Sequence, residues 1–184
     1  MTPPKSIVAL AGSVQPGSYT LRALRLVIDD LEARYGLSVD LLDPARLSLP
    51  FPGQPATPDV ARVQNAVRAA RGAILATPEY HGSYSSVLKQ LIDNLGHPSP
   101  LAGKPVALLG VAHGAIGAVK SLEHLRSVCA HLGAVVLPKA VSIAGADQAF
   151  DDAGHCTNEE VAARLHNLAA ALAEFLGAPA SADI

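Results

Sequence analysis

The stretch IVALAGSVQPGSYTLRALRLVIDDL, residues 7–31, joins a short apolar run to a helical pattern through a loop of turn residues. Ile7–Ala11 is an unbroken apolar run, which is typical of a strand covered on both faces of a sheet. From Leu21 onward, apolar residues recur three and four apart, which predicts an amphipathic helix. A buried strand that runs through a loop into a helix begins a βαβ unit, so this stretch indicates an α/β fold.

The same alternation is repeated along the chain. The predicted strands are Ser6–Ala11, Ser38–Leu42, Ala73–Ala76, Pro105–Gly110 and Val135–Leu137, the last extending toward Ile143. The segments that follow them have helical spacing, so five strands alternate with five helices and predict a parallel sheet with right-handed crossovers. We expect a three-layer flavodoxin-like fold with a five-stranded parallel sheet in the order 2-1-3-4-5 and helices on both faces, which suits this strand count better than the six-stranded dinucleotide-binding fold.

Three helix starts carry capping signals. Ser18 is a suitable cap for the first helix, and Thr57 precedes a proline and an aspartate at the start of the second. Thr157 and Glu160 form a T-x-x-E capping box before the last helix.

Composition excludes several classes of protein. Hydrophobic residues make up 49% and charged residues 16% of the 184 residues, which favours one globular domain, residues 1–184, over a disordered chain. A net charge of −2 without a basic block gives no footprint for nucleic acid. No apolar run approaches the ~20 residues that span a membrane. Ile7–Ala11 is also shorter than the apolar core of a signal peptide, so we expect a cytoplasmic protein.

Other segments have simple interpretations. Cys129 and Cys156 are too few and too isolated for a disulfide framework or a zinc site. The Pro-rich stretch at residues 49–58 is expected to be a surface loop, and residues 177–184 a frayed tail.

The carboxyl ends of the strands are where function is expected, because ligands of open α/β sheets bind there, at the switch in strand order. Three loops should meet at this edge: residues 12–20, 77–85 and 111–117. Each is rich in Gly or Ser or carries side chains that could contact a ligand.

The first of these loops has the Gly12–Gly17 spacing of a Walker A loop, but Ser18 stands where that loop has lysine. Ser13, Ser18 and Thr20 add hydroxyl groups, and the helix that follows offers unpaired amides to an anion. Two interpretations stay open from these residues alone: a phosphate cradle, or an ordinary capped turn. Neither the GxGxxG dinucleotide motif nor the GxSxG nucleophile motif occurs in the chain.

The second loop carries the most specific signal, TPEYHGSYSSVLKQLIDNL at residues 77–95. It resembles the Pro-Glu-Tyr-Asn motif and the following Leu-Lys-x-x-Ile-Asp helix of the NADPH-dependent FMN reductase family, which includes flavin, quinone, azo-dye and chromate reductases. Gly12, Ser13 and Ser18 match that family's Gly-Ser-x-Arg-x-x-Ser-x-Asn pattern. Residues 144–168 resemble its closing segment, so the likeness runs from about Ile7 to Leu176.

This resemblance implies a flavodoxin-like fold with bound FMN, NADPH or NADH as hydride donor, and a small-molecule acceptor. It implies a homodimer or a dimer of dimers, and it assigns no catalytic side chain and no metal ligand. The first loop would bind the FMN phosphate, while the second and third would line the flavin ring largely through backbone groups. The implied cofactor-binding residues are Ser13, Gln15, Gly17, Ser18, Tyr19, Thr20, Pro78, Glu79, Tyr80, His81, Ala112, His113 and Gly114.

The chain departs from the family pattern at several of these positions. Gln15 replaces arginine, Thr20 replaces asparagine, His81 replaces asparagine, and Ala112-His113 replaces Ser-Gly. Without the arginine, the phosphate loses a charge-assisted hydrogen bond worth ~1.5–3 kcal/mol.

Several polar residues allow two interpretations. The side chains of His81 and His113 could hydrogen-bond the flavin or a substrate, or they could fill loop positions where only the backbone matters. Glu79 could be a general base, but its place in the motif favours a structural role. His124 and His131 lie two helical turns, about 10.5 Å, apart, too far to share a metal ion, which favours surface or interface roles.

The functional interpretation is an oxidoreductase that passes hydride from NAD(P)H through FMN to a flavin, quinone, azo or metal-oxyanion acceptor by a ping-pong mechanism. The alternative is a flavodoxin-like electron carrier without NAD(P)H turnover of its own, and a fold member that has lost FMN is a third. Carriers often clamp the flavin with aromatic residues and present an acidic face. Here only three tyrosines lie in the site loops, tryptophan is absent and the net charge is −2, which favours the enzyme.

Overall fold

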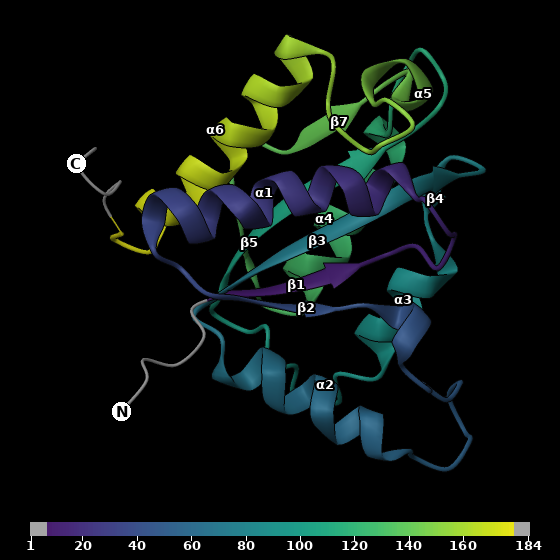
Figure 1. The fold of residues 1–184 in the computed structure, drawn as a ribbon. Helices are drawn as coiled ribbons and strands as arrows, with labels where there is room; N and C mark the ends of the chain where they lie inside the picture. The colour runs from purple at the N-terminus through teal and green to yellow at the C-terminus, as the bar shows by residue number, and fades with distance from the viewer. Residues whose placement is uncertain (1–6, 179–184) are drawn as a thin grey trace.

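In the computed structural model, which describes residues 7–178, a sheet lies between two layers of helices (Figure 1). The strands are β1 (Ile7–Ala11), β2 (Val39–Leu42), β3 (Gly72–Tyr80), β4 (Ser83–Tyr84), β5 (Pro105–Val111), β6 (Val135–Val136) and β7 (Val141–Ile143). The α-helices are α1 (Tyr19–Tyr35), α2 (Pro58–Ala69), α3 (Ser86–Asp93), α4 (Val119–His131), α5 (Ala146–Ala149) and α6 (Glu159–Phe175), and Pro44–Arg46 form a short 3-10 helix. Ser6, expected to begin the first strand, lies outside the described residues.

The strand order is β2-β1-β3-β5-β6, with every neighbouring pair parallel, so the predicted flavodoxin-like order is confirmed. The count of five strands was too low, because the sheet has seven strands within residues 7–178. The last sheet position is shared by β6 and β7, which both pair with β5 and are separated by the segment at residues 137–140. Pro138 lies in that segment and has no amide to donate, which explains an interruption there.

The other additional strand is β4, which pairs antiparallel with the end of β3. The third strand was expected to stop at Ala76, but β3 continues to Tyr80 because it keeps pairing with β5 as far as Pro78 and then turns back along β4. This extension raises the second site loop above the edge of the sheet as a hairpin.

Both faces of the sheet are covered, which explains why the strands lack an alternating pattern. Along β1, Ile7, Ala9 and Ala11 belong to one buried cluster, and Val8 and Leu10 belong to the other. Helices α1 and α6 cover the first face, and α2, α3 and α4 cover the second (Figure 1).

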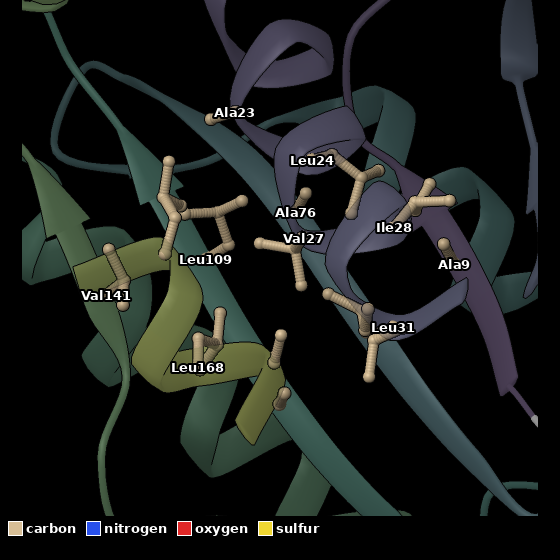
Figure 2. Close-up of a cluster of buried hydrophobic side chains, with 14 of the residues drawn as sticks. Ala9, Ala23, Leu24, Val27, Ile28, Leu31, Ala76, Leu109, Val141 and Leu168 are labelled. Atoms are coloured by element: carbon tan, nitrogen blue, oxygen red, sulfur yellow. The ribbon is translucent and has the colours of Figure 1, made fainter. Parts of the chain in front are cut away.

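The cluster beneath α1 and α6 combines large side chains of both helices with strand side chains that include several alanines (Figure 2). Its labelled members are Ala23, Leu24, Val27, Ile28 and Leu31 of α1, Ala9, Ala76, Leu109 and Val141 of the strands, and Leu168 of α6. Alanines in the strands let α1 pack close to the sheet, which fixes where its first turn meets the end of β1.

The capping expectations are met only in part. Asn158, not Thr157, caps α6: its Oδ1 accepts a hydrogen bond from Val161 N at 3.0 Å. Thr57 occupies the cap position of α2, but its hydroxyl donates to the carbonyl of Ser48 and makes no capping bond. When the side chain at a cap position bonds a distant residue instead, the unpaired amides at the helix start must bond a neighbouring side chain or water.

Two segments outside the helices and strands were expected to be a surface loop and a frayed tail. In the Pro-rich loop at residues 49–58, Phe51 is 63% exposed. At the other end of the chain, Gly177 and Ala178 donate backbone hydrogen bonds to Glu174 and Ala173, and the rest of the expected frayed tail, residues 179–184, lies outside the described residues. None of the helices within residues 7–178 is long and apolar enough to cross a membrane.

Candidate functional site

The loops that follow β1, β3 and β5 line one pocket at the carboxyl edge of the sheet. Its lining residues are Gln15, Gly17, Ser18, Tyr19, Thr20, Pro78, Glu79, Tyr80, Val111, Ala112 and His113. Of the thirteen positions expected from the sequence, only Ser13, His81 and Gly114 lie outside the lining, and Val111 is an addition. The structure therefore brings the three loops together as the switch in strand order predicts.

The first loop begins at Gly12, which passes close to the middle of the sheet. Its N–H donates to the carbonyl of Ala76 at 2.7 Å, and a Cβ at this position would lie 2.6 Å from the same oxygen. Any side chain here would push the loop away from β3. Gly12 thus fixes where the loop leaves the sheet.

A network of buried hydroxyl groups ties this loop to the second one. The Oγ of Ser85 donates to the carbonyl of Gly12 at 2.6 Å and accepts from Leu88 N, which it caps at the start of α3, at 3.1 Å. The amide of Ser85 donates to Thr77 Oγ1 at 3.0 Å, and that hydroxyl donates to Pro78 O at 2.8 Å. Ser85 is 1% exposed and Thr77 is fully buried, so water cannot replace these bonds. Neither residue was assigned to the site from the sequence, although both lie within the quoted motif.

The start of α1 presents unpaired donors to the pocket. Ser18 occupies the cap position, as expected, but its side chain makes no capping bond. Although Ser18 is 8% and Thr20 only 2% exposed, neither hydroxyl has a hydrogen-bond partner within residues 7–178. The first intrahelical bond of α1 is from Arg22 N to Ser18 O, and Ser18 N donates to Gln15 O at 3.1 Å, so the amides of Tyr19, Thr20 and Leu21 are the ones without a backbone partner among the described residues.

These donors favour one of the two interpretations of the loop, the anion site. An ordinary capped turn would use the Ser18 hydroxyl on its own backbone, whereas an anion site needs free hydroxyls and amides at a helix start. The uncommitted hydroxyls of Ser18 and Thr20 fit the phosphate of FMN. Ser13 contributes indirectly, because its Oγ accepts from Gln15 N at 3.3 Å and so shapes the turn beneath the lining.

The second wall of the pocket is the β3–β4 hairpin, which pairs Glu79 with Tyr84 and Tyr80 with Ser83. The two-residue turn between them has positive φ at both positions, 50° at His81 and 74° at Gly82. Such a type I′ turn prefers Asn-Gly, because asparagine tolerates the left-handed region better than histidine. This geometry explains an asparagine in the motif. The His81 side chain is exposed and lies outside the lining, whereas its backbone forms the turn.

Glu79 anchors that hairpin to α4. One carboxylate oxygen, Oε2, accepts from Ser121 N at 3.1 Å and from Ser121 Oγ at 2.9 Å, and Ser121 is fully buried. The structural role expected for Glu79 is confirmed, since this oxygen is committed to two donors. The anchor also sets the position of Tyr80, which is 49% exposed at the rim.

The third wall follows β5. Ala112 is fixed on both sides, because its amide donates to Ile143 O at 2.9 Å and its carbonyl accepts from Ala146 N at 3.2 Å. The ring of His113 meets the ring of Tyr19 edge-on, with centroids 5.4 Å apart, and so closes the pocket against the first loop. The Nδ1 of His113 lies 3.8 Å from Asp147 Oδ1, an exposed pair that contributes little to stability.

Other candidate groups are committed elsewhere. Burial raises the pKa of the Cys129 thiol to about 11, so it is not a nucleophile at neutral pH. His124 hydrogen-bonds Ser83 Oγ through Nδ1 at 3.0 Å. Within the part of the chain that the structure describes, no group of three or more His, Cys, Asp or Glu side chains could hold a metal ion. The pocket therefore offers donors for an anion and walls for a planar group.

The sheet order defines a flavodoxin-like fold, and the start of α1 places free hydroxyls at the pocket that its loops form. The sequence pattern of the NADPH-dependent FMN reductase family matches residues 6–148, and the chain belongs to that family. It is therefore an oxidoreductase whose family uses FMN and a nicotinamide donor.

Individual relatives agree with this assignment. The chain is 33% identical over 165 residues to an NAD(P)H-dependent FMN reductase of Pseudomonas aeruginosa, covering 84% of this chain and 85% of that protein. It is 32% identical over 152 residues to a quinone reductase of Escherichia coli, covering 77% and 78% of the two chains. The solved structure of FerB, an NAD(P)H:(acceptor) oxidoreductase of Paracoccus denitrificans, superposes with a TM-score of 0.77 at 24% identity, over 96% of this chain and all of that one, which shows the shared fold.

Proposed function

We propose that this protein catalyses the NAD(P)H-dependent reduction of a small-molecule acceptor through bound FMN, by a ping-pong mechanism. The acceptors we propose are a flavin, a quinone, an azo compound or a metal oxyanion. The observation that carries the proposal is one pocket lined by three loops, with the free hydroxyls of Ser18 and Thr20 in one loop and the residues Pro78–Tyr80 and Val111–His113 in the other two.

We assign the lining residues two roles, binding the FMN phosphate and orienting the flavin ring. Ser18, Thr20 and the first amides of α1 would hold the phosphate, because hydroxyls and helix-start amides are the donors that a dianion needs. The hairpin at Pro78–Tyr80 and the opposite wall at Ala112–His113 would orient the ring. FMN, when bound, supplies the hydride chemistry, which explains why the chain needs no nucleophile or acid–base pair of its own.

The shape of the pocket supports the ping-pong order. Tyr80 is 49% exposed and the His113 side chain is 72% exposed, so two of the lining residues of this one pocket face solvent. A nicotinamide and an acceptor that enter through the same mouth exclude each other. Each must leave before the next can bind, which defines a substituted-enzyme mechanism.

Initial-rate kinetics test this order. With NAD(P)H varied at several fixed concentrations of a quinone or flavin acceptor, we expect parallel double-reciprocal lines. Intersecting lines would mean that donor and acceptor bind together, which contradicts the shared mouth.

We also propose that the protein acts as a homodimer or a dimer of dimers. The apolar arc of α3 does not support this, because Leu88, Leu91 and Ile92 are buried in the core of the same chain. The support comes from exposed apolar residues beside the site, Ile116 at 84% and Val119 at 44%. Sedimentation that shows only monomer at micromolar concentration would contradict the proposed homodimer.

We also propose a cytoplasmic location, because both cysteines are free thiols.

A further inference from the structure

The anion end of the pocket contains no Lys or Arg among its lining residues, and Gln15 is neutral. A phosphate held only by hydroxyls and amides has no full positive charge opposite it. One guanidinium, that of Arg22, lies beside the loop. A Cβ built on Gly17 would lie 3.7 Å from Arg22 Nη2.

Arg22 is held in this position from two sides. Its Nη1 donates to the carbonyl of Asp151 at 2.6 Å, and its guanidinium carbon lies 5.1 Å from the centre of the Tyr19 ring. A Cβ built on Gly154 would lie 3.7 Å from Arg22 Nε, so the arginine runs between the first loop and the turn at residues 151–154. The Arg22 side chain extends from the first turn of α1, and its contacts with Tyr19 and with the turn at residues 151–154 fix the position of its guanidinium.

The charge of Arg22 is not neutralised by a carboxylate within residues 7–178. Its partner at Asp151 is the backbone carbonyl, a neutral group. The Asp151 carboxylate is engaged by His155 instead, through the backbone amide at 2.8 Å and Nδ1 at 3.1 Å. The Nη2 group of Arg22, on the side of Gly17, has no hydrogen-bond partner among the described residues.

We propose that Arg22 supplies the positive charge of the FMN phosphate site, and that the turn at residues 151–154 positions it for this role. The proposal rests on the proposed function, because it assumes that FMN is the ligand. It extends the site to a residue outside the pocket lining and to a segment that follows the last strand of the sheet. A free, oriented guanidinium beside free helix-start amides is a strong arrangement for a phosphate dianion.

The test compares FMN with riboflavin, which lacks the phosphate, by flavin fluorescence titration of the purified protein. We expect the wild type to prefer FMN. Arg22→Gln should weaken FMN binding about tenfold while leaving riboflavin binding unchanged, since one charge-assisted contact is lost. Arg22→Lys should retain most of the preference. Arg25→Gln is the matched control, because Arg25 is exposed on the same helix and changes the net charge equally.

Salt adds a second readout. FMN affinity of the wild type should fall as the NaCl concentration is raised, and the fall should be smaller in Arg22→Gln.

Two results for Arg22→Gln would overturn the proposal. If this variant binds FMN and riboflavin more weakly by the same factor, Arg22 acts only by packing on Tyr19. An unchanged FMN affinity in that variant overturns it as well. Equal affinity of the wild type for FMN and riboflavin would be a different result. It would show that the first loop does not bind the phosphate, and so it would contradict the proposed function of that loop as well as the role of Arg22.

Discussion

Replacing Ser85 by alanine tests how the first two walls of the pocket are held together. The change removes the hydroxyl that donates to Gly12 O at 2.6 Å and accepts from Leu88 N at 3.1 Å. Ser85 is 1% exposed, so both partners are left without water as a substitute. An unsatisfied buried group costs ~1–3 kcal/mol and a lost helix cap typically ~1 kcal/mol, so Ser85→Ala should lower the free energy of unfolding by about 2–4 kcal/mol.

Urea unfolding followed by circular dichroism measures this loss. The matched control is Ser86→Ala, because Ser86 is the next residue, is exposed and makes no side-chain hydrogen bond within the described chain. The control should stay within about 0.5 kcal/mol of the wild type. FMN affinity, measured on folded Ser85→Ala, should fall as well, since the loop at Gly12 is no longer fixed. A loss of stability equal to that of the control would refute the claim that this network holds the site.

Three further outcomes follow from single side chains. His81→Asn should raise the melting temperature by about 2–4 °C if the turn gains the ~1 kcal/mol expected from relieving its left-handed strain, and a lower melting temperature would contradict that geometry. Ser18→Glu should abolish FMN binding in titrations while the fold is retained, whereas Val14→Glu, in the same loop but outside the lining, should bind FMN; unchanged affinity in Ser18→Glu would place the phosphate elsewhere. Because burial raises the pKa of Cys129 to about 11, a thiol reagent at pH 8 should modify only Cys156 in the native protein, and rapid labelling of both would contradict this burial.

The sheet could be predicted from the sequence because its strands are buried on both faces. A continuous apolar run such as Ile7–Ala11 indicates that environment directly, alternation with helices predicts a parallel sheet, and the strand count favoured the flavodoxin-like order. The β4 strand was missed because two residues, Ser83–Tyr84, carry no periodicity. The split of the last strand was missed because β6 and β7 are also too short to show one.

Side-chain partners far apart in the chain could not be predicted from local patterns. The bond from Ser85 to Gly12 spans 73 positions, and the bond from Arg22 to Asp151 spans 129. Local patterns located the pocket through its loops but did not show what fixes them. The same limit affects the caps, since Thr157 and Asn158 are equally suitable by residue type and only the geometry of α6 selects the second.

The most direct measurement of the central claim is anaerobic mixing of the FMN-loaded protein with NADPH and, separately, with NADH, followed by the absorbance of oxidised flavin. The proposed oxidoreductase function predicts that at least one nicotinamide bleaches the flavin within seconds, and that little one-electron reduced flavin accumulates, because hydride delivers two electrons together. If neither nicotinamide bleaches the flavin on that timescale, while titration with dithionite produces a stable one-electron state, the reductase function is contradicted and the protein is an electron carrier.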